Sequence, residues 1–140
     1  DAVEVAGPVY RFYNASTGEH FYTKSEAEKQ NLINAKWSYE GVCYDSVDAK
    51  DGSAVYRFFN PLTGEHHYTT DPVEAGSLKQ NGWNDEGISF YVKTGNGTPV
   101  YRLFNIAATN AGAHHYTSDY TEYLSLKSSG WSDEGVCWYY

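Results

Sequence analysis

The chain has 140 residues, the size of one domain, with a net charge of −8 and an isoelectric point near 4.9. Hydrophobic residues make up 41% and aromatic residues 17%, which excludes a disordered chain, and no apolar run approaches the roughly 20 residues that cross a bilayer. The positive charges are few and scattered, which excludes nucleic-acid binding through a basic face.

Residues 1–8 precede the first regular element and contain no charged-then-apolar secretion signal. We interpret them as a linker, which indicates a piece of a longer polypeptide or a processed form. The chain has no methionine and is rich in Tyr, Asn, Ser, Thr and Gly. This composition suits an extracellular location, so we expect a secreted or cell-wall-associated protein without membrane insertion.

Residues 9–23 predict a β-hairpin. The segment 9–14 alternates between two faces as a strand does, and Thr17 and Gly18 separate it from a second aromatic stretch at 19–23. The same two blocks recur at 55–69 and, with two extra loop residues, at 100–117. All three arginines of the chain occupy one position of the first block: Arg11, Arg57 and Arg102.

A short helix is predicted after each hairpin. Its start is marked by a capping box in every copy: Ser25 with Glu28, Asp71 with Glu74, and Asp119 with Glu122. Its inward face is marked by one repeated leucine: Leu32, Leu78 and Leu126. Its end is marked in two copies by Gly82 and Gly130, which suit a left-handed residue, whereas the first copy has Lys36 there.

A third block, Trp-x-x-Glu-Gly, follows at 37–41, 83–87 and 131–135 and leads into a short strand that we expect to be buried, at 42–44, 88–90 and 136–138. The chain is therefore three copies of one unit of about 46 residues. The copies span 9–54, 55–99 and 100–140, and the loops 45–54 and 92–99 connect them.

One such unit cannot bury its own apolar side, so the three are expected to share one core about a pseudo-threefold axis. A propeller needs at least about four blades, and a solenoid needs polar end caps, which the sequence lacks. We predict an all-β fold, a single β-trefoil domain over residues 9–140, with one short helix per repeat.

The blocks Tyr-Arg-Phe-Tyr-Asn, Thr-Gly-Glu-His-Phe-Tyr-Thr and Trp-x-x-Glu-Gly resemble a repeat family of secreted bacterial and some fungal proteins. In that family the repeats accompany cell-wall hydrolases, peptidases and other secreted enzymes. The resemblance implies a β-trefoil module that binds glycan or cell wall and is fused to a catalytic domain in the parent chain. The third copy departs from the pattern, because Ala113 replaces the carboxylate of Glu19 and Glu65.

The histidines suggest a metal site, but their spacing does not favour one. Consecutive strand residues point to opposite faces, so His66 and His67 cannot hold one ion from the same side, and the sequence has no His-x-His or Cys-x-x-Cys spacing. We predict no metal and no cofactor, and hydrogen bonds for His20, His66 and His114 within each unit. As ligand-binding candidates we keep all five: His20, His66, His67, His114 and His115.

Each arginine has a repeated opposite charge in the last block: Arg11 with Glu40, Arg57 with Glu86, and Arg102 with Glu134. The favoured interpretation is an ion pair within the unit, which fixes geometry more than it adds stability. The planar guanidinium is also suited to donate to sugar hydroxyls or to a carboxylate. Both roles are compatible if the pair lines the floor of a pocket between the hairpin and the last block.

The three tryptophans of the last block, Trp37, Trp83 and Trp131, are candidate platforms, since an exposed indole stacks on the apolar face of a sugar. A tryptophan directly after a helix is more often a core residue, and we favour that interpretation. Positions that differ between copies are candidates for specificity, because contact positions are free to vary: Phe21/His67/His115 and Tyr39/Asp85/Asp133.

Two cysteines occupy one repeat position, Cys43 in the first copy and Cys137 in the third, where the second copy has Ser89. Equivalent strands converge near a threefold axis, so a disulfide between them is one interpretation in an oxidising compartment. Two separate thiols, packed as small apolar residues, are the other.

Catalysis is not predicted. A glycosidase needs two carboxylates about 5–10 Å apart, but a threefold-repeated active site is not expected, and the sequence has no nucleophile elbow or phosphate loop. We expect a lectin-like, carbohydrate-binding module with up to three weak sites that gain by engaging one polymer together. The acidic surface favours a neutral or amino-sugar polymer. The alternative is a protein–protein adhesion or spacer module without glycan binding.

Overall fold

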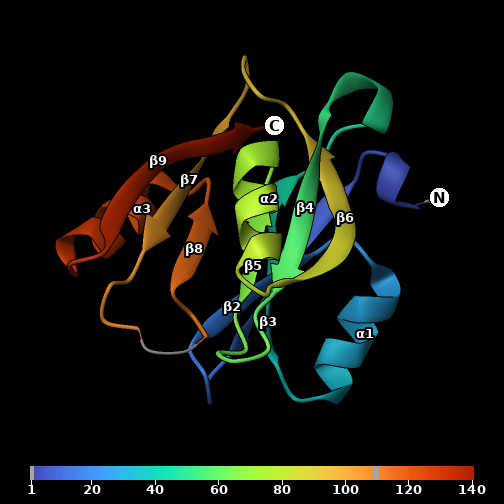
Figure 1. Cartoon of the computed structure of the whole chain (residues 1–140). Coiled ribbons are helices and arrows are strands. Elements are labelled where there is room, and N and C mark those ends of the chain that lie inside the picture. Colours follow the sequence, from blue (N-terminus) through green and yellow to red (C-terminus); the bar gives the residue numbers. More distant parts are fainter. Residues whose placement is uncertain (1, 109–110) are drawn as a thin grey trace.

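The computed structural model describes residues 2–108 and 111–140 and consists of three β-β-α-β units, one for each repeat (Figure 1). The first unit contains β1 (Pro8–Asn14), β2 (Glu19–Thr23), α1 (Glu26–Asn34) and β3 (Ser38–Asp45). The second contains β4 (Ser53–Phe59), β5 (His66–Thr69), α2 (Pro72–Gln80) and β6 (Asn84–Val92). The third contains β7 (Pro99–Phe104), β8 (His114–Thr117), α3 (Tyr120–Ser128) and β9 (Ser132–Tyr139).

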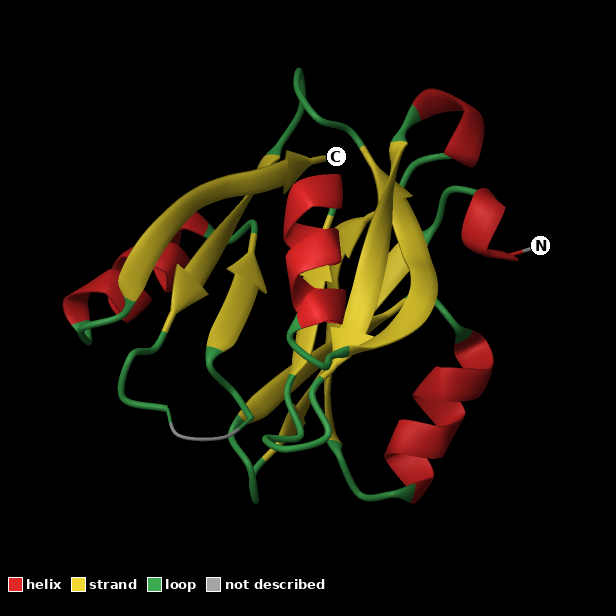
Figure 2. Ribbon diagram, viewed as in Figure 1, coloured by secondary structure: helices red, strands yellow, loops and turns green. Residues whose placement is uncertain are grey.

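Each unit forms one antiparallel sheet with its first strand in the middle, in the orders β2-β1-β3, β5-β4-β6 and β8-β7-β9. The helices lie apart from one another around the molecule, each at the edge of its own unit (Figure 2). The predicted hairpins, the mostly β content and the single helix per repeat are confirmed. The closed barrel of a β-trefoil is not formed, because strand pairing among the described residues leaves the three sheets separate.

The predicted cap residues and the helix-end glycines are confirmed. The capping boxes are only half formed, because the N–H of each cap residue donates to a threonine hydroxyl and not to the helix glutamate. At the start, the side chains of Ser25, Asp71 and Asp119 accept hydrogen bonds from backbone N–H groups of the first turn. At the end, Gly82 and Gly130 have φ angles of +88° and +97°, the left-handed conformation that glycine adopts without steric cost. Lys36 takes the same conformation in the first unit, with φ +71°.

The core centres on one tyrosine from the second strand of each unit: Tyr22, Tyr68 and Tyr116. Each hydroxyl accepts a hydrogen bond from the backbone N–H of another member, at 2.9–3.0 Å, so that the three bonds form a closed ring. The aromatic rings meet edge to face, with centroids 5.3–5.4 Å apart. The three units therefore share one interior in cyclic order.

A second aromatic layer adjoins this ring and is formed by Tyr44, Phe90 and Trp138 from the last strands. These residues are buried, as predicted for the last strands. The residues two positions earlier are not: Val42, Ile88 and Val136 are exposed by 56, 39 and 42%. The prediction of uniformly buried strands is therefore wrong at this position. In each unit the pairing register shifts between these two residues, as in a β-bulge, so that residues two positions apart turn to different sides.

The segment interpreted as a linker makes contacts with the rest of the chain. Ala2–Glu4 forms a short 3-10 turn, η1, which lies against β6 and a second turn, η2 (Ala49–Asp51). The backbone N–H of Ala6 donates to the Asp48 carboxylate at 2.7 Å. No helix in the described part of the chain is long and apolar enough to cross a membrane.

Candidate functional site at the unit junctions

Each arginine lies where two units meet. Arg11 in β1 donates through Nε to Glu40 of its own unit at 2.8 Å. Its two terminal nitrogens donate to the two carboxylate oxygens of Glu122 in α3, at 2.8 and 3.2 Å. The same fork joins Arg57 to Glu86 and to Glu28 of α1, and Arg102 to Glu134 and to Glu74 of α2. We call these places the 3–1, 1–2 and 2–3 junctions.

The predicted ion pair within each unit is present, but it is half of the arrangement. The sequence interpretation missed the helix glutamates as site residues, because it assigned Glu28, Glu74 and Glu122 to capping boxes. The cap residue does bind the first helical turn, while the glutamate carboxylate faces the arginine of the next unit. Their occurrence at one position in all three repeats was the signal that could have found them.

The helix glutamates are held ionised. Burial alone raises the pKa of Glu122, but hydrogen bonds from His115 and Arg11 outweigh it and leave the pKa well below its ordinary value of 4.5. The pKa values of Glu28 and Glu74 are lowered in the same way, with burial opposed and overcome by hydrogen-bonded neighbours. Each junction therefore combines one guanidinium with two carboxylates at partly buried positions.

The first histidine of each copy contacts two units. Its Nε2 lies 3.4–3.6 Å from the last-block glutamate of its own unit, in keeping with the prediction, while its Nδ1 crosses a junction. Nδ1 of His66 lies 3.1 Å from Glu19, and Nδ1 of His114 lies 2.8 Å from Glu65. At the 3–1 junction Ala113 offers no carboxylate, and Nδ1 of His20 lies 3.2 Å from Nδ1 of His115. Burial, His115 and Arg11 lower the pKa of His20 to about 3.

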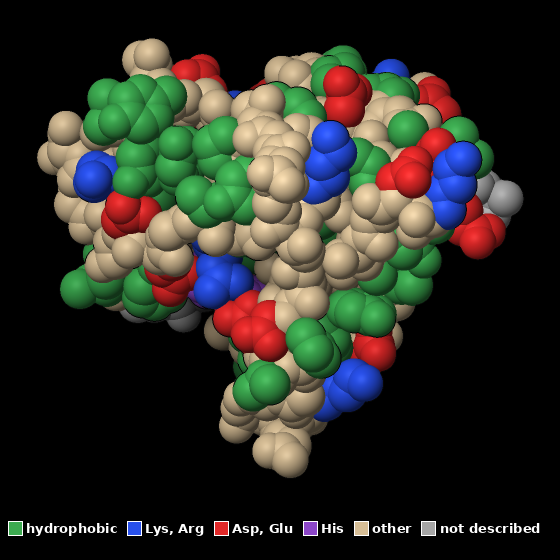
Figure 3. Space-filling view, turned by 90° about the horizontal axis from the view of Figure 1, so that it is seen from above, with side chains coloured by type: hydrophobic (Ala, Val, Ile, Leu, Met, Phe, Trp, Pro, Cys, Tyr) green, Lys and Arg blue, Asp and Glu red, His purple; other side chains and the backbone are tan. Residues whose placement is uncertain are grey.

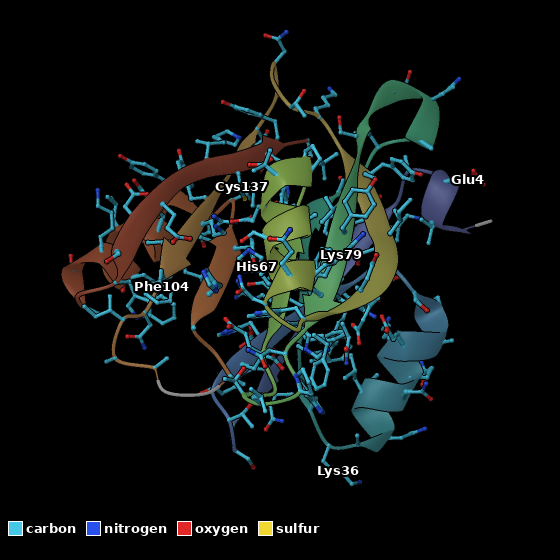
Figure 4. All side chains as sticks on the ribbon, viewed as in Figure 1. Glu4, Lys36, His67, Lys79, Phe104 and Cys137 are labelled. Atoms are coloured by element: carbon cyan, nitrogen blue, oxygen red, sulfur yellow. The ribbon has the colours of Figure 1, made fainter. Side chains whose placement is uncertain are left out.

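The variable position Phe21/His67/His115 is buried, with exposures of 5, 4 and 2%. Nε2 of His67 lies 3.2 Å from Glu74, and Nε2 of His115 lies 3.0 Å from Glu122, whereas the Phe21 ring lies 4.7 Å from the Arg57 guanidinium. These residues are buried and pack against the arginine–glutamate ion pairs, so they are not exposed to a ligand. Figure 4 labels His67 beside α2, the helix that carries Glu74.

Trp37, Trp83 and Trp131 are half-buried, and their rings lie 5.9–6.1 Å from Phe21, His67 and His115. Their contacts agree with the packing role that we favoured. The other variable position, Tyr39/Asp85/Asp133, lies away from the junctions, at the face between each sheet and its own helix.

A pocket opens at each junction, bounded by two units and not by one as predicted. The cavities measure about 280 Å³ at the 1–2 junction and about 140 Å³ at each of the others. Each contains the arginine, both glutamates and the threonine that ends the second strand, with the exposed aliphatic residue and the adjacent cysteine or serine of the last strand. The exposed residues of the last strand, which were predicted to be buried, therefore line the pockets: Val42, Ile88 and Val136.

The two cysteines lie in different pockets and are free thiols, so the disulfide interpretation is not realised. Sγ of Cys43 lies 3.4 Å from the carbonyl of Val9, and Sγ of Cys137 lies 3.2 Å from that of Val100, both within the unit. Burial raises the pKa of each thiol to about 12. Over residues 2–108 and 111–140, no group of three or more His, Cys, Asp or Glu side chains is placed to hold a metal ion.

These features define a pseudo-threefold repeat domain whose units are joined through charged junctions, with one pocket at each junction. Residues 8–140 match the family described as Domain of unknown function (DUF5648), and the chain belongs to that family. No curated protein and no solved structure matches the chain.

Proposed function

We propose that the chain is a non-catalytic glycan-binding module whose three junction pockets each take one sugar residue. The observation that carries the proposal is the recurrence of the pocket, with an arginine, two glutamates, a threonine and an aliphatic residue in each lining. Ion pairs that only hold the units together do not require a cavity beside them. Three equivalent pockets are suited to a repeating polymer, because several sites that bind one polymer together raise its overall affinity.

The chemistry of the lining suits a polyhydroxylated ligand. The carboxylate oxygens offer acceptors that the arginine already holds in place. The threonine hydroxyl beside them is fixed by the helix glutamate, to which it donates, and by the N–H of the cap residue, from which it accepts. Oε1 of Glu40 accepts from Arg11, while Oε2 has no partner among the described residues and is available to a ligand hydroxyl. The exposed aliphatic residue beside it gives an apolar contact for the carbon face of a sugar ring.

The charge of the pockets supports a neutral or amine-bearing sugar. Carboxylates outnumber the single arginine in each pocket, and the chain as a whole carries a charge of −8. On the face drawn in Figure 3, acidic and basic side chains are interspersed and form no large basic area. An anionic polymer would be repelled at low salt.

The protonation state of the helix glutamates favours binding over turnover. A glycosidase needs one carboxyl group that keeps its proton near neutral pH. The pKa values of Glu28, Glu74 and Glu122 are shifted in the opposite direction, so these groups cannot donate a proton there. The resemblance to repeats of secreted proteins further supports a secreted module fused to a catalytic domain.

The test is a glycan array followed by calorimetry on purified peptidoglycan and chitin fragments. Truncation of Arg57 would test the fold, because this side chain joins the first two units. A better variant changes Val42, Ile88 and Val136 to arginine. The two pocket carboxylates would draw each new side chain into the cavity, and we expect binding to be lost with the fold retained.

The matched control is Leu62→Arg in the hairpin loop, where the side chain is 93% exposed and outside the three pockets. It adds charge without filling a cavity and should leave binding unchanged. Absence of binding to every glycan, in a folded protein, would overturn the proposal and leave a protein-adhesion or spacer module.

A further inference from the structure

Another cavity lies inside the second unit, between α2 and its own sheet, apart from the three junction pockets. It measures about 240 Å³. Its lining includes Tyr56 and Phe58 from β4, Ala75, Gly76 and Lys79 from α2, and Asp85 from β6. Figure 4 labels Lys79. Nζ of Lys79 lies 3.5 Å from the Asp85 carboxylate at the edge of this cavity.

The third unit shows what fills the equivalent space. Tyr123, at the position of Ala75, stacks on Tyr101 with a centroid distance of 4.1 Å and an interplanar angle of 20°. The Tyr123 hydroxyl donates to Asp133, which stands at the position of Asp85. Tyr101 stands at the position of Tyr56.

The basic side chain at the edge is also repeated. Nζ of Lys127 lies 5.0 Å from the centroid of the Tyr123 ring and 3.7 Å from Asp133. Lys79 stands at the same repeat position in the second unit. Three partners of Tyr123 thus recur around the cavity, while the ring itself is missing from it. A fourth partner, Tyr120, lies 5.6 Å from the Tyr123 ring and is replaced by Pro72 in the second unit.

The first unit fills the same space with a different side chain. Lys29 stands at the position of Ala75 and Tyr123, and its ammonium lies 4.3 Å from the centroid of Tyr10 and 5.0 Å from that of Tyr39. Two of the three units therefore close this space with a helix side chain, and the second leaves it open by having Ala75.

We propose that this cavity, which we call the α2 pocket, binds a hydroxyphenyl ring supplied by another molecule. The ring stacks on Tyr56 as Tyr123 stacks on Tyr101, its hydroxyl donates to Asp85, and Lys79 lies at its edge. The ring could belong to a tyrosine side chain of a partner or to a free phenol, which share this chemistry. The proposal stands apart from glycan binding, since Ala75 lines none of the junction pockets.

The test is a titration of the ¹⁵N-labelled protein followed by NMR. The probes are N-acetyl-tyrosinamide, N-acetyl-phenylalaninamide and 4-methylphenol. We expect saturable shifts of the Ala75, Gly76 and Asp85 amides with the tyrosine amide, and about tenfold weaker binding of the phenylalanine amide, which lacks the hydroxyl. If 4-methylphenol saturates the pocket and N-acetyl-tyrosinamide does not, the pocket is assigned to a free phenol. If both compounds saturate it, the pocket is assigned to a tyrosine side chain, because it then also accepts a ring that is attached to a peptide backbone.

Two variants use the repeat as an internal template. Ala75→Tyr copies the third unit, so we expect it to abolish the shifts and to raise the melting temperature. Tyr123→Ala should open an equivalent pocket, with a second set of shifts near Asp133. Asp85→Asn keeps the shape and should remove the preference for the tyrosine amide over the phenylalanine amide, which gives a result even where Ala75→Tyr fails to fold.

Absence of saturable shifts with both phenols, or shifts that persist unchanged in folded Ala75→Tyr, would overturn the proposal. Glycan binding provides a separate readout. Ala75→Tyr should retain it, because the residues of the three junction pockets are unchanged.

Discussion

The 2–3 and 3–1 junctions are built alike but differ at one buried position. In both, an arginine bridges two glutamates, and a buried histidine lies against the helix glutamate. At the 2–3 junction Glu65 also holds His114, whereas at the 3–1 junction Ala113 leaves His20 facing His115. Both junctions contain an edge-to-face pair of imidazole rings, His67 with His114 and His20 with His115, whose centroids lie 4.5 and 4.4 Å apart. The difference is therefore the carboxylate of Glu65, which the 3–1 junction lacks.

This difference shows which part of the repeat is needed to hold the units together. The arginine fork is kept at all three junctions, while the carboxylate beneath it is present at two and replaced at the third. The replacement leaves His20 buried without a carboxylate for its Nδ1. We therefore expect the 3–1 junction to respond to acid before the others do.

The largest expected effect tests whether the forks are equivalent. Arg11→Met and Arg102→Met should each lower the free energy of unfolding by about 3 kcal/mol at pH 7, because each leaves two partly buried carboxylates without their counter-charge. Urea unfolding of the two variants measures this loss. A difference between them of more than about 1 kcal/mol would show that the junctions are not equivalent at neutral pH.

The second effect separates the junctions by pH. The pKa of His20 is about 3 in the folded protein and 6.5 ordinarily, so between these values the unfolded chain binds a proton that the folded chain refuses. The free energy of unfolding should therefore fall as the pH is lowered below about 6.5, by up to roughly 1.4 kcal/mol per pH unit.

His67 adds to this loss, because burial lowers its pKa as well. Below the ordinary value of 4.5, protonation of Glu28, Glu74 and Glu122 removes further stability, since their folded pKa values are depressed. Urea unfolding between pH 7 and pH 4 measures how steeply the free energy of unfolding changes with pH. This dependence should be weaker in His20→Gln, and an unchanged dependence would rule out His20 as a cause of the loss.

The third effect converts one junction into the other. Ala113→Glu places a carboxylate beside Nδ1 of His20, so the pKa of His20 should rise and the protein should gain about 1 kcal/mol near pH 6. The reverse change, Glu65→Ala, should cost a similar amount at the 2–3 junction. NMR titration of the histidine signals checks both, and a His20 signal that titrates identically in Ala113→Glu would refute the comparison.

The smallest effect concerns the helix ends. Lys36 adopts a left-handed conformation where the other two units have glycine. Lys36→Gly should therefore stabilise the protein by about 0.5 kcal/mol, since relief of backbone strain exceeds the added freedom of the unfolded chain. Thermal unfolding measures this gain, and Lys36→Ala, which keeps the strain, is the control.

Local structure was predictable because its causes are local. The turn at Thr17 and Gly18, the cap residue Ser25 and the helix end at Gly82 each depend on neighbours within a few positions, and the structure agrees with the sequence at all three. The cyclic sharing of one core was also indicated, because a unit of about 46 residues cannot bury its aromatic face alone.

The junctions were not predictable in the same way. Glu122 and Arg11 are separated by 111 positions, and nothing in either block shows that they meet. The pairing depends on the direction in which the units follow one another around the axis, which single-unit patterns do not encode. The closed barrel was wrongly expected, because the two strands before the helix and the one after it pair into a separate sheet within each unit. The α2 pocket had a visible signal, the replacement of Lys29 and Tyr123 by Ala75, but its meaning needed the space around that residue.

The ring of units closes through a contact unlike the other two in one respect. Arg57 and Arg102 reach helices 29 and 28 positions away, in the unit that directly precedes their own, while Arg11 must find the last helix of the chain. The third unit of one molecule presents the same surface to the first unit of any other, so a concentrated solution favours exchange of whole units between molecules. Such domain-swapped assemblies would join the junction pockets of several chains in one continuous array, and they would use the same contact surfaces as the single chain.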